Sequence, residues 1–231
     1  MNLTGMKELT IGGVNLKELS IDGVKTWQSG RLPADFTELE YIEATGTQYI
    51  DLGITGQNGL SVELNIEVLS PVNSGGSCII GSTNSSSQRC YITANPSYQP
   101  FAWELGAGNY YVDHEDLAKF NQKYKLHIDW TKAKTVLKVD DVETTTLQNS
   151  FTFDNNNTNM TLFARNKSGT AEKFARARAH KDQYVWINGV LVGQFVPARH
   201  RGGTLGLYNL LTNEFHINAG TGEFIAGTVV G

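Results

Sequence analysis

The sequence predicts an all-β fold, a sandwich or jelly roll, from three observations. Its 231 residues include 24 Gly together with many Asn, Ser and Thr, a composition typical of a chain with many turns. Ten Phe, nine Tyr and four Trp supply large core side chains, and aromatic residues favour strands. Short runs of alternating apolar and polar residues recur at roughly 8–12-residue spacing, which indicates many short strands.

The first thirty residues contain an internal repeat that predicts two β-hairpins. Residues 8–17 read ELTIGGVNLK, and residues 18–27 read ELSIDGVKTW. In each unit an apolar–polar–apolar run meets Gly-Gly or Asp-Gly and then Val, the pattern of a two-residue hairpin turn. Because so small a hairpin buries little surface, two roles remain open. Residues 1–30 either form an attachment and oligomerisation segment or add edge strands to the main sheet.

Residues 31–231 are predicted to form one sandwich domain of short strands. The clean alternation over 60–69 predicts a strand with one buried face. Asn188-Gly189 between two alternating runs is the strongest hairpin signal, and Asp140-Asp141 stands at a second hairpin tip. Further strands are expected at residues 78–82, 90–94, 123–130, 134–147, 160–166 and 206–218.

Two segments need a choice between helix and another structure. Residues 113–122 are a candidate for a short helix. In residues 171–181, AEKFARARAHK, the alanines favour helix. Phe174, Arg176, Arg178 and His180 nevertheless alternate with small residues, as in a strand. Since this segment directly precedes a predicted hairpin, we expect a strand.

Charge and cysteine content limit the partners and the compartment. The net charge of −4 gives no reason to expect a nucleic acid partner, and no apolar run reaches the length of a membrane span. The N-terminus lacks a basic region followed by an apolar core, so we expect a chain made and folded in a cytoplasm. Cys78 and Cys90 could face each other across a hairpin, but buried thiols without a disulfide are favoured there.

Two segments at opposite ends of the domain carry a resemblance to a known family. They are RLPADFTELEYIEATGTQYIDLGI at 31–54 and INGVLVGQFVPARHRGGTLGLYNLLTNEFHINAGTGEF at 187–224. The chain resembles concanavalin-A-like (laminin-G-like) jelly-roll domains of phage and prophage tail, fibre and other virion structural proteins. The resemblance covers 32–54 and 161–224, and the tandem repeat is similar to segments that precede such domains.

The resemblance implies a fold, a location and a set of partners. It implies that the first and last strands of the jelly roll pair with each other. It further implies a location in the virion, homo-oligomers, and contacts with other virion proteins through residues 1–30. Related laminin-G-like domains often bind calcium at a loop rim, and Asp140, Asp141 and Asp154 are available here. No ligand spacing singles them out, so neither a metal nor a cofactor is predicted.

No catalytic residues are predicted. Glucanases of related fold carry a Glu-x-Asp-x-Glu strand that places two carboxylates on one face, and this chain has no such string. The acidic groups at 113–116 and 140–143 fit a polar loop and a hairpin tip. The sequence also lacks HExxH and a nucleophile elbow.

Two clusters are candidates for binding. Trp103, Asn109, Tyr110 and Tyr111 lie in a glycine-rich aromatic stretch, where exposed rings and amides would suit carbohydrate binding. The alternative is that these rings fill the core. If residues 174–180 form a strand, then Arg176, Arg178 and His180 share one face. That face would bind an acidic polymer or a neighbouring subunit, or would simply be solvated.

The sequence thus predicts a non-enzymatic phage virion protein, a tail or head fibre or decoration component. Its lectin-like domain would contact host-surface glycans, and many copies on one particle would give avidity. Two alternatives remain open. One is a purely architectural decoration or collar protein without a ligand. The other is a divergent glycan-degrading enzyme.

Overall fold

The fold is described from a computed structural model of the 231-residue chain. The backbone of the strands at 9–28 and 101–111, and of residues 134, 135, 137 and 144–148, is described without side chains. The described ranges are 9–11, 14–16, 18–21, 24–28, 31–69, 76–85, 88–94, 101–106, 108–111, 120–131, 134–148 and 155–230.

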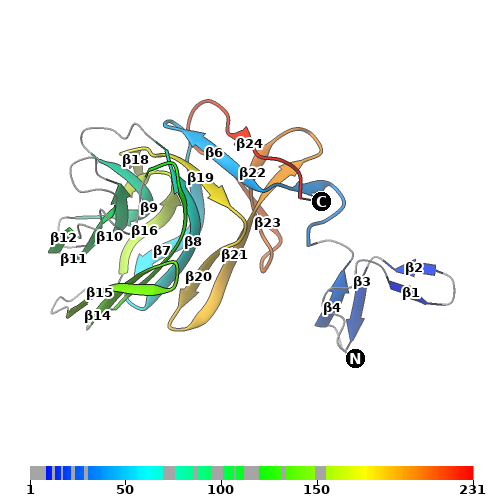
Figure 1. The fold of residues 1–231 in the computed structure, drawn as a ribbon, viewed down its shortest axis with the longest axis horizontal. Coiled ribbons are helices and arrows are strands. Elements are labelled where there is room, and N and C mark those ends of the chain that lie inside the picture. The colour runs from blue at the N-terminus through cyan, green and yellow to red at the C-terminus, as the bar shows by residue number, and fades with distance from the viewer. Residues whose placement is uncertain are drawn as a thin grey trace.

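Two large sheets form a β-sandwich, as predicted (Figure 1). One sheet has eight strands, with the path β12-β11-β10-β9-β16-β7 and with β17 and β18 beside it. These strands are β7 (Ile50–Gln57), β9 (Ser77–Thr83), β10 (Arg89–Ala94), β11 (Phe101–Gly106), β12 (Gly108–Tyr111), β16 (Asn155–Leu162), β17 (Arg165–Lys167) and β18 (Thr170–Glu172).

The second sheet has twelve strands, with the path β15-β14-β13-β8-β20-β21-β22-β23. The strands β5, β6, β19 and β24 pair with members of this path or with each other. The twelve are β5 (Phe36–Glu38), β6 (Tyr41–Thr45), β8 (Leu60–Val68), β13 (Lys123–Trp130), β14 (Lys134–Val139), β15 (Val142–Gln148), β19 (Arg176–His180), β20 (Gln183–Ile187), β21 (Val190–His200), β22 (Leu205–Asn209), β23 (Glu214–Ile217) and β24 (Ile225–Ala226).

One apolar core lies between the two sheets. In β8 every second residue from Leu60 to Val68 is buried and the residues between are partly exposed, which confirms the predicted half-buried strand. The opposite sheet contributes Ile50, Ile80 and Leu162 to the same cluster of buried side chains. The described residues contain no helix, and therefore none that could cross a membrane.

The two hairpin signals are confirmed by backbone conformation. Asn188 and Gly189 have φ values of 50° and 77°, and Asp140 and Asp141 have φ values of 48° and 67°. Two successive positive φ angles identify a type I′ turn, whose twist matches the flanking strands. Asn, Asp and Gly tolerate this conformation, which explains the choice of residues at both tips.

The two ends of the sandwich domain pair with each other, as the resemblance implies. Strand β6 pairs with β24, and Leu39 forms a bridge with Val229. The backbone N–H of Ala219 donates to the carbonyl of Tyr49 over 2.9 Å. In Figure 1 the blue strand β6 and the red strand β24 lie side by side, so the beginning and the end of the sandwich domain close the fold together.

Gln48 joins these two segments through its side chain. It is 2% exposed, its Oε1 accepts from the backbone N–H of Thr45 over 2.8 Å, and its Nε2 donates to the carbonyl of Glu223 over 2.9 Å. Gln48→Ala is expected to lower the free energy of unfolding by about 1–2 kcal/mol because buried polar groups lose their partners. Chemical denaturation measures this loss. Gln57→Ala, in the half-buried part of β7, is the control, and equal effects of the two changes would contradict the role of Gln48.

The other predictions for the sandwich have mixed outcomes. Residues 171–181 contain β18 and β19, which confirms the choice of strand. Cys78 and Cys90 lie in the neighbouring strands β9 and β10, are buried and form no disulfide, and burial raises the pKa of Cys90. The register places Cys78 opposite Thr93 and Cys90 opposite Ser82, so the two cysteines are not direct cross-strand partners, and the favoured buried thiols without a disulfide are confirmed. The candidate helix at 113–122 lies mostly outside the described residues.

The N-terminal repeat forms the two predicted hairpins. Strands β1 (Leu9–Ile11) and β2 (Val14–Leu16) pair in one sheet, and β3 (Glu18–Ile21) and β4 (Val24–Gln28) pair in another. Within the described residues these strands are not edge strands of the two large sheets. A division of the chain into 1–30 and 31–231 stays a prediction.

Candidate functional site

Three neighbouring strands of the twelve-stranded sheet place six polar and aromatic side chains on its outer face. Strand β8 lies between β13 and β20, and the antiparallel registers align the six in two rows. Alternating residues on these strands, such as Val62, Ile128 and Val185, are buried in the core, so the six point outward. This aromatic-carboxylate face consists of Trp186, Ser61 and Asp129 in one row and Tyr184, Glu63 and His127 in the other.

The aromatic part of the face is a stacked pair of rings. Tyr184 and Trp186 are two residues apart on β20, and their ring planes lie 21° apart with centroids 5.6 Å from each other. The ring of His127 lies 6.0 Å from that of Trp186. Both members of the pair are partly exposed, so ring surface remains accessible from solvent.

The polar part of the face centres on His127. Its Nε2 lies 3.3 Å from a carboxylate oxygen of Asp129 and 3.5 Å from Oγ of Ser61, and its Nδ1 lies 3.9 Å from Glu63. The hydrogen bond from His127, supported by Ser61, lowers the pKa of Asp129 below its ordinary 3.8. Asp129 is therefore ionised at neutral pH and offers acceptor oxygens on the face.

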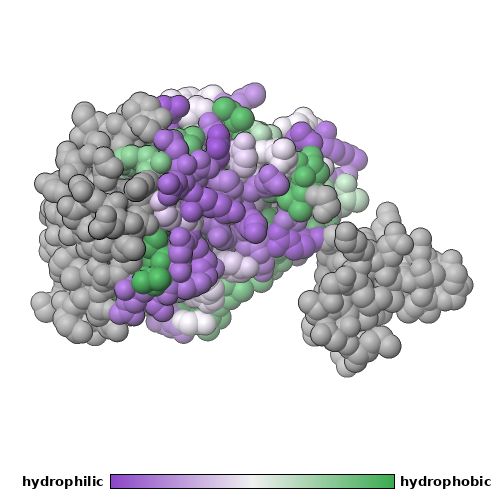
Figure 2. Space-filling view, viewed as in Figure 1, coloured by the Kyte–Doolittle hydropathy of each residue, from purple (hydrophilic) through white to green (hydrophobic). Residues whose placement is uncertain are grey.

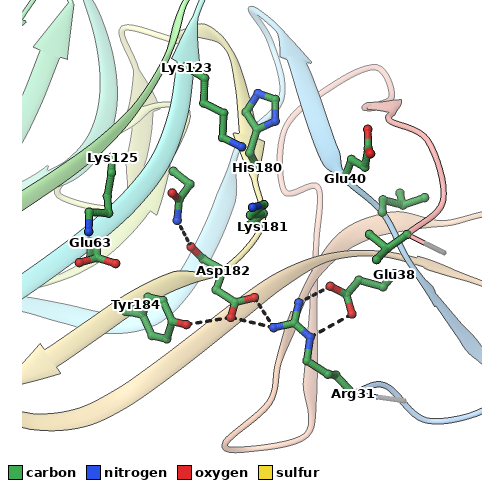
Figure 3. A pocket seen from close by; sticks show the side chains of 13 residues that line it. Arg31, Glu38, Glu40, Glu63, Lys123, Lys125, His180, Lys181, Asp182 and Tyr184 are labelled. Carbon is green, nitrogen blue, oxygen red and sulfur yellow. Dashed lines mark hydrogen bonds and ion pairs between the residues drawn. The ribbon is translucent and has the colours of Figure 1, made fainter. Parts of the chain in front are cut away.

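A hydrogen-bond network around Asp182 fixes the position of Tyr184 (Figure 3). The hydroxyl of Tyr184 donates to Asp182 over 2.8 Å, and Gln194 donates to the same carboxylate over 3.1 Å. Arg31 makes two bonds to Asp182, of 2.6 and 2.7 Å, and also pairs with Glu38. Burial and the Asp182 hydrogen bond raise the pKa of Tyr184 to about 12, so the hydroxyl stays neutral and the ring is held in place.

Two cavities flank the aromatic-carboxylate face. A cavity of about 580 Å³, which Figure 3 shows, is bordered by Glu63 and Tyr184. A second cavity of about 420 Å³ is bordered by Ser61, Asp129 and Trp186. The stacked rings thus stand between two hollows, an arrangement that gives a ligand access to ring faces and to carboxylates together.

The predicted basic stripe lies on β19, where Arg178 and His180 already have carboxylate partners. Arg178 donates to Glu43 over 2.7 Å and lies 3.2 Å from Glu67, and His180 lies 3.1 Å from Glu67. These carboxylates raise the pKa of Arg178, with Glu43 contributing most. Arg176 lies on the same face of the strand. Figure 2 shows hydrophilic residues across this part of the visible surface, and acidic-polymer binding there stays a prediction.

Acidification is expected to destabilise the fold through His180. Burial lowers its pKa below 6.5, against the effect of Glu67, while Lys123 and Arg178 lower it further. Because the unfolded chain then binds more protons, the stability tied to neutral His180 is present above pH 6.5 and lost as the pH falls below it. Melting temperatures between about pH 7.5 and 5.5 should fall less for His180→Gln than for the wild type. Equal slopes would contradict this assignment.

The predicted aromatic site is described only by its backbone. Strands β11 and β12 pair, with Trp103 opposite Tyr110, Asn109 opposite Glu104 and Tyr111 opposite Ala102. The side chains of these residues lie outside the described part of the structure. Their role in carbohydrate binding therefore stays a prediction.

Of the aspartates that are available for calcium, only Asp140 and Asp141 lie within the described residues. Asp140 and Asp141 form the β14–β15 hairpin tip, where Asp141 pairs with Lys125 over 2.5 Å. Asp154 lies outside the described residues. In the described ranges no group of three or more His, Cys, Asp or Glu side chains is arranged to hold a metal ion.

Sequence reasoning missed the aromatic-carboxylate face. The outward residues of each strand are visible in the alternation of 60–69, 123–130 and 184–187. The alternation does not predict which strands are neighbours in the sheet. Strands β13, β8 and β20 lie side by side although they are not consecutive in the chain.

The fold is similar to that of several solved structures. A candidate carbohydrate-binding protein from Bacteroides ovatus matches with a TM-score of 0.54 and 10% identity, over 84% of this chain and 62% of that protein. Domains LG4-5 of mouse laminin α1 match with a TM-score of 0.45 and 16% identity, over 69% of this chain and 43% of that protein. A pentraxin from Limulus polyphemus matches with a TM-score of 0.42 and 12% identity, over 65% of this chain and 74% of that protein.

These likenesses concern the fold and not the activity. The chain spans less than two thirds of the length of the Bacteroides ovatus protein. No protein-family model and no curated protein matches the sequence. At such low identities the likeness shows the architecture alone, an all-β sandwich, which agrees with the predicted fold class.

Proposed function

We propose that this chain is a lectin-like display protein that binds glycans on its aromatic-carboxylate face. The observation that carries the proposal is the stacked Tyr184–Trp186 pair beside Glu63 and Asp129. Sugar rings present apolar C–H faces that pack on aromatic rings, and their hydroxyls donate to carboxylates. The fold likeness to a candidate carbohydrate-binding protein also supports the proposal.

The charges of the face favour one class of glycan. Carboxylate oxygens of Glu63 and Asp129 lie 3.9 and 3.3 Å from the ring nitrogens of His127, and a carboxylate or phosphate on a ligand bound there would meet like charge. Neutral sugars and amino sugars would donate hydrogen bonds to the same oxygens. Beside the two carboxylates the preferred ligand is therefore a neutral or amino sugar, although the cavity next to Glu63 also has Lys123, Lys125 and Lys181 in its wall.

The proposed setting is a phage virion, with the domain displayed on a fibre or decoration component. This part rests on the resemblance of residues 32–54 and 161–224 to virion domains. Repeated copies held by the N-terminal segment would convert weak single contacts into strong attachment through avidity. No bond is made or broken in this mechanism.

A glycan array with the full chain tests the binding proposal. We expect neutral or amino glycans to bind and acidic glycans to bind less. Absence of binding to every glycan, together with burial of the aromatic-carboxylate face against virion proteins in a map of the particle, would support the purely architectural alternative.

A second candidate function is glycan cleavage, favoured by the pair of carboxylates on one face. Glu63 and Asp129 flank His127, and two carboxyl groups are the usual machinery of glycoside hydrolysis. Incubation of a bound glycan with the protein tests it. Product release that Glu63→Gln and Asp129→Asn abolish would establish cleavage, and intact glycan after prolonged incubation would exclude it.

A further inference from the structure

We propose that the domain carries a second binding site, on the outer face of the opposite sheet, for a neutral hydroxyl-rich ligand such as a hexose. The site is a cavity of about 500 Å³ over β7, β16 and the β17–β18 hairpin. Its described lining includes Tyr49, Asp51, Asn84, Asn157, Asn159 and Asn166.

The cavity faces away from the aromatic-carboxylate face. On β7, Asp51 is partly exposed while its neighbours Ile50 and Leu52 are buried in the core. On β16, Asn159 is partly exposed while Met160 is buried. Because β7 and β16 belong to the eight-stranded sheet, their outward side chains leave the sandwich on the side opposite to β8 and β13.

The polar groups of the cavity are held in place by hydrogen bonds. Asn159 donates to Asp51 over 3.3 Å, and Asn166 donates to the carbonyl of Asn159 over 3.0 Å. Ser168 donates to the side-chain oxygen of Asn84 over 3.0 Å. The wall is therefore organised before a ligand arrives, which lowers the entropy lost on binding.

Two of the polar residues in the wall are largely buried. Asn166 is 9% exposed and Thr158 is 7% exposed, although both border the cavity. Burial of polar side chains costs free energy that solvated surface residues do not incur, and each of these two is satisfied by a hydrogen bond. Such a wall differs from an ordinary solvated strand face.

The chemistry of the wall matches hydroxyl groups. A carboxamide both donates and accepts, as a sugar hydroxyl does, so several amides around one cavity complement vicinal hydroxyls. Asp51 is the only charged group in the described lining, and no cation stands there to attract a phosphate or a carboxylate. Tyr49 adds a partly exposed ring for an apolar C–H face.

Two sites on opposite faces would make each chain bivalent. One copy could then bridge two glycan chains, or two points on one chain, and so raise the avidity of the particle. The second site shares neither residues nor a sheet with the aromatic-carboxylate face, so either site can bind without the other.

Titration of the full chain with glucose, galactose and N-acetylglucosamine tests the second site. The readout is the side-chain amide NMR signals of Asn157, Asn159 and Asn166, recorded with each sugar up to about 50 mM, well above a millimolar Kd. We expect at least one of the three sugars to shift these signals in the wild type. The same shifts are expected in Trp186→Ala, which leaves the cavity intact.

Asn157→Gly and Asn213→Gly form a matched pair of variants. Both replace an exposed Asn at positive φ, 53° and 60°, by the residue that best tolerates this conformation. We expect Asn157→Gly to weaken binding roughly fivefold through a lost side-chain hydrogen bond, and Asn213→Gly to leave it unchanged. Unmoved asparagine signals with all three sugars would overturn the second site, and so would equal affinities of the two variants. Shifts confined to the Trp186 indole would uphold only the proposed glycan-binding face.

Discussion

Trp186→Ala is expected to reduce the affinity for a bound glycan about thirtyfold, a loss of about 2 kcal/mol, the size typical of a central aromatic contact. The indole stacks on Tyr184 and borders the cavity that Ser61 and Asp129 also line. Removal of the ring takes away the apolar platform and exposes Tyr184 on one side. Titration calorimetry with the best glycan from the array measures the loss.

Two control variants separate stacking from general damage. Trp186→Phe keeps a ring and is expected to retain more affinity than Trp186→Ala. Val190→Ala removes an apolar side chain that is 66% exposed on the same β20–β21 hairpin, and it is expected to bind as the wild type does. Equal affinity of Trp186→Ala and the wild type would show that the glycan binds elsewhere.

The strands and their turns could be predicted because they depend on local residues. Alternation over 60–69 identified β8, and Asn188-Gly189 and Asp140-Asp141 identified two type I′ turns. These signals act within a few residues, where side-chain periodicity and the tolerance of positive φ decide the conformation. The closure of the sandwich by its two ends came from the resemblance instead, since no local pattern brings Leu39 to Val229.

The aromatic-carboxylate face could not be predicted, because it depends on the order of strands in the sheet. Ser61 and Asp129 are 68 positions apart in the sequence, and the register of β8 with β13 places them opposite each other. An antiparallel sheet of twelve strands admits many orders that would preserve each strand's own alternation. The sequence of one short segment therefore favours dense local clusters as candidate sites, such as the aromatic stretch that contains Trp103, Tyr110 and Tyr111.

The charge environment of the basic stripe also depends on the order of strands in the sheet. Alternation placed Arg176, Arg178 and His180 on one face correctly. The neighbours of β19 are β6 and β8, which bring Glu43 and Glu67 beside Arg178. A stripe that looks cationic in the sequence is thus a ladder of opposite charges across three strands, a common way to stabilise a sheet face.

Phe163→Ala is expected to lower the free energy of unfolding by about 3–5 kcal/mol, the usual cost of deleting a fully buried aromatic side chain. Phe163 is 0% exposed, and its ring centroid lies 5.8 Å from that of Phe224 in the C-terminal segment. Its backbone N–H donates to the carbonyl of Ile79 over 2.7 Å. Phe163→Leu keeps most of the volume and should cost about 1.5 kcal/mol or less. Denaturant unfolding of the three proteins measures both changes.

The backbone of Phe163 allows a sharper comparison. Its φ of 70° is unfavourable for a residue with a Cβ, by about 1–2 kcal/mol, so the core contacts of the ring must offset this strain. Glycine relieves the strain, whereas in an ordinary strand Gly is less stable than Ala by about 0.5–1 kcal/mol. Phe163→Gly should therefore unfold at the same denaturant concentration as Phe163→Ala or a higher one, although it removes one more carbon. A Gly variant clearly less stable than the Ala variant would mean that Phe163 does not adopt the left-handed conformation.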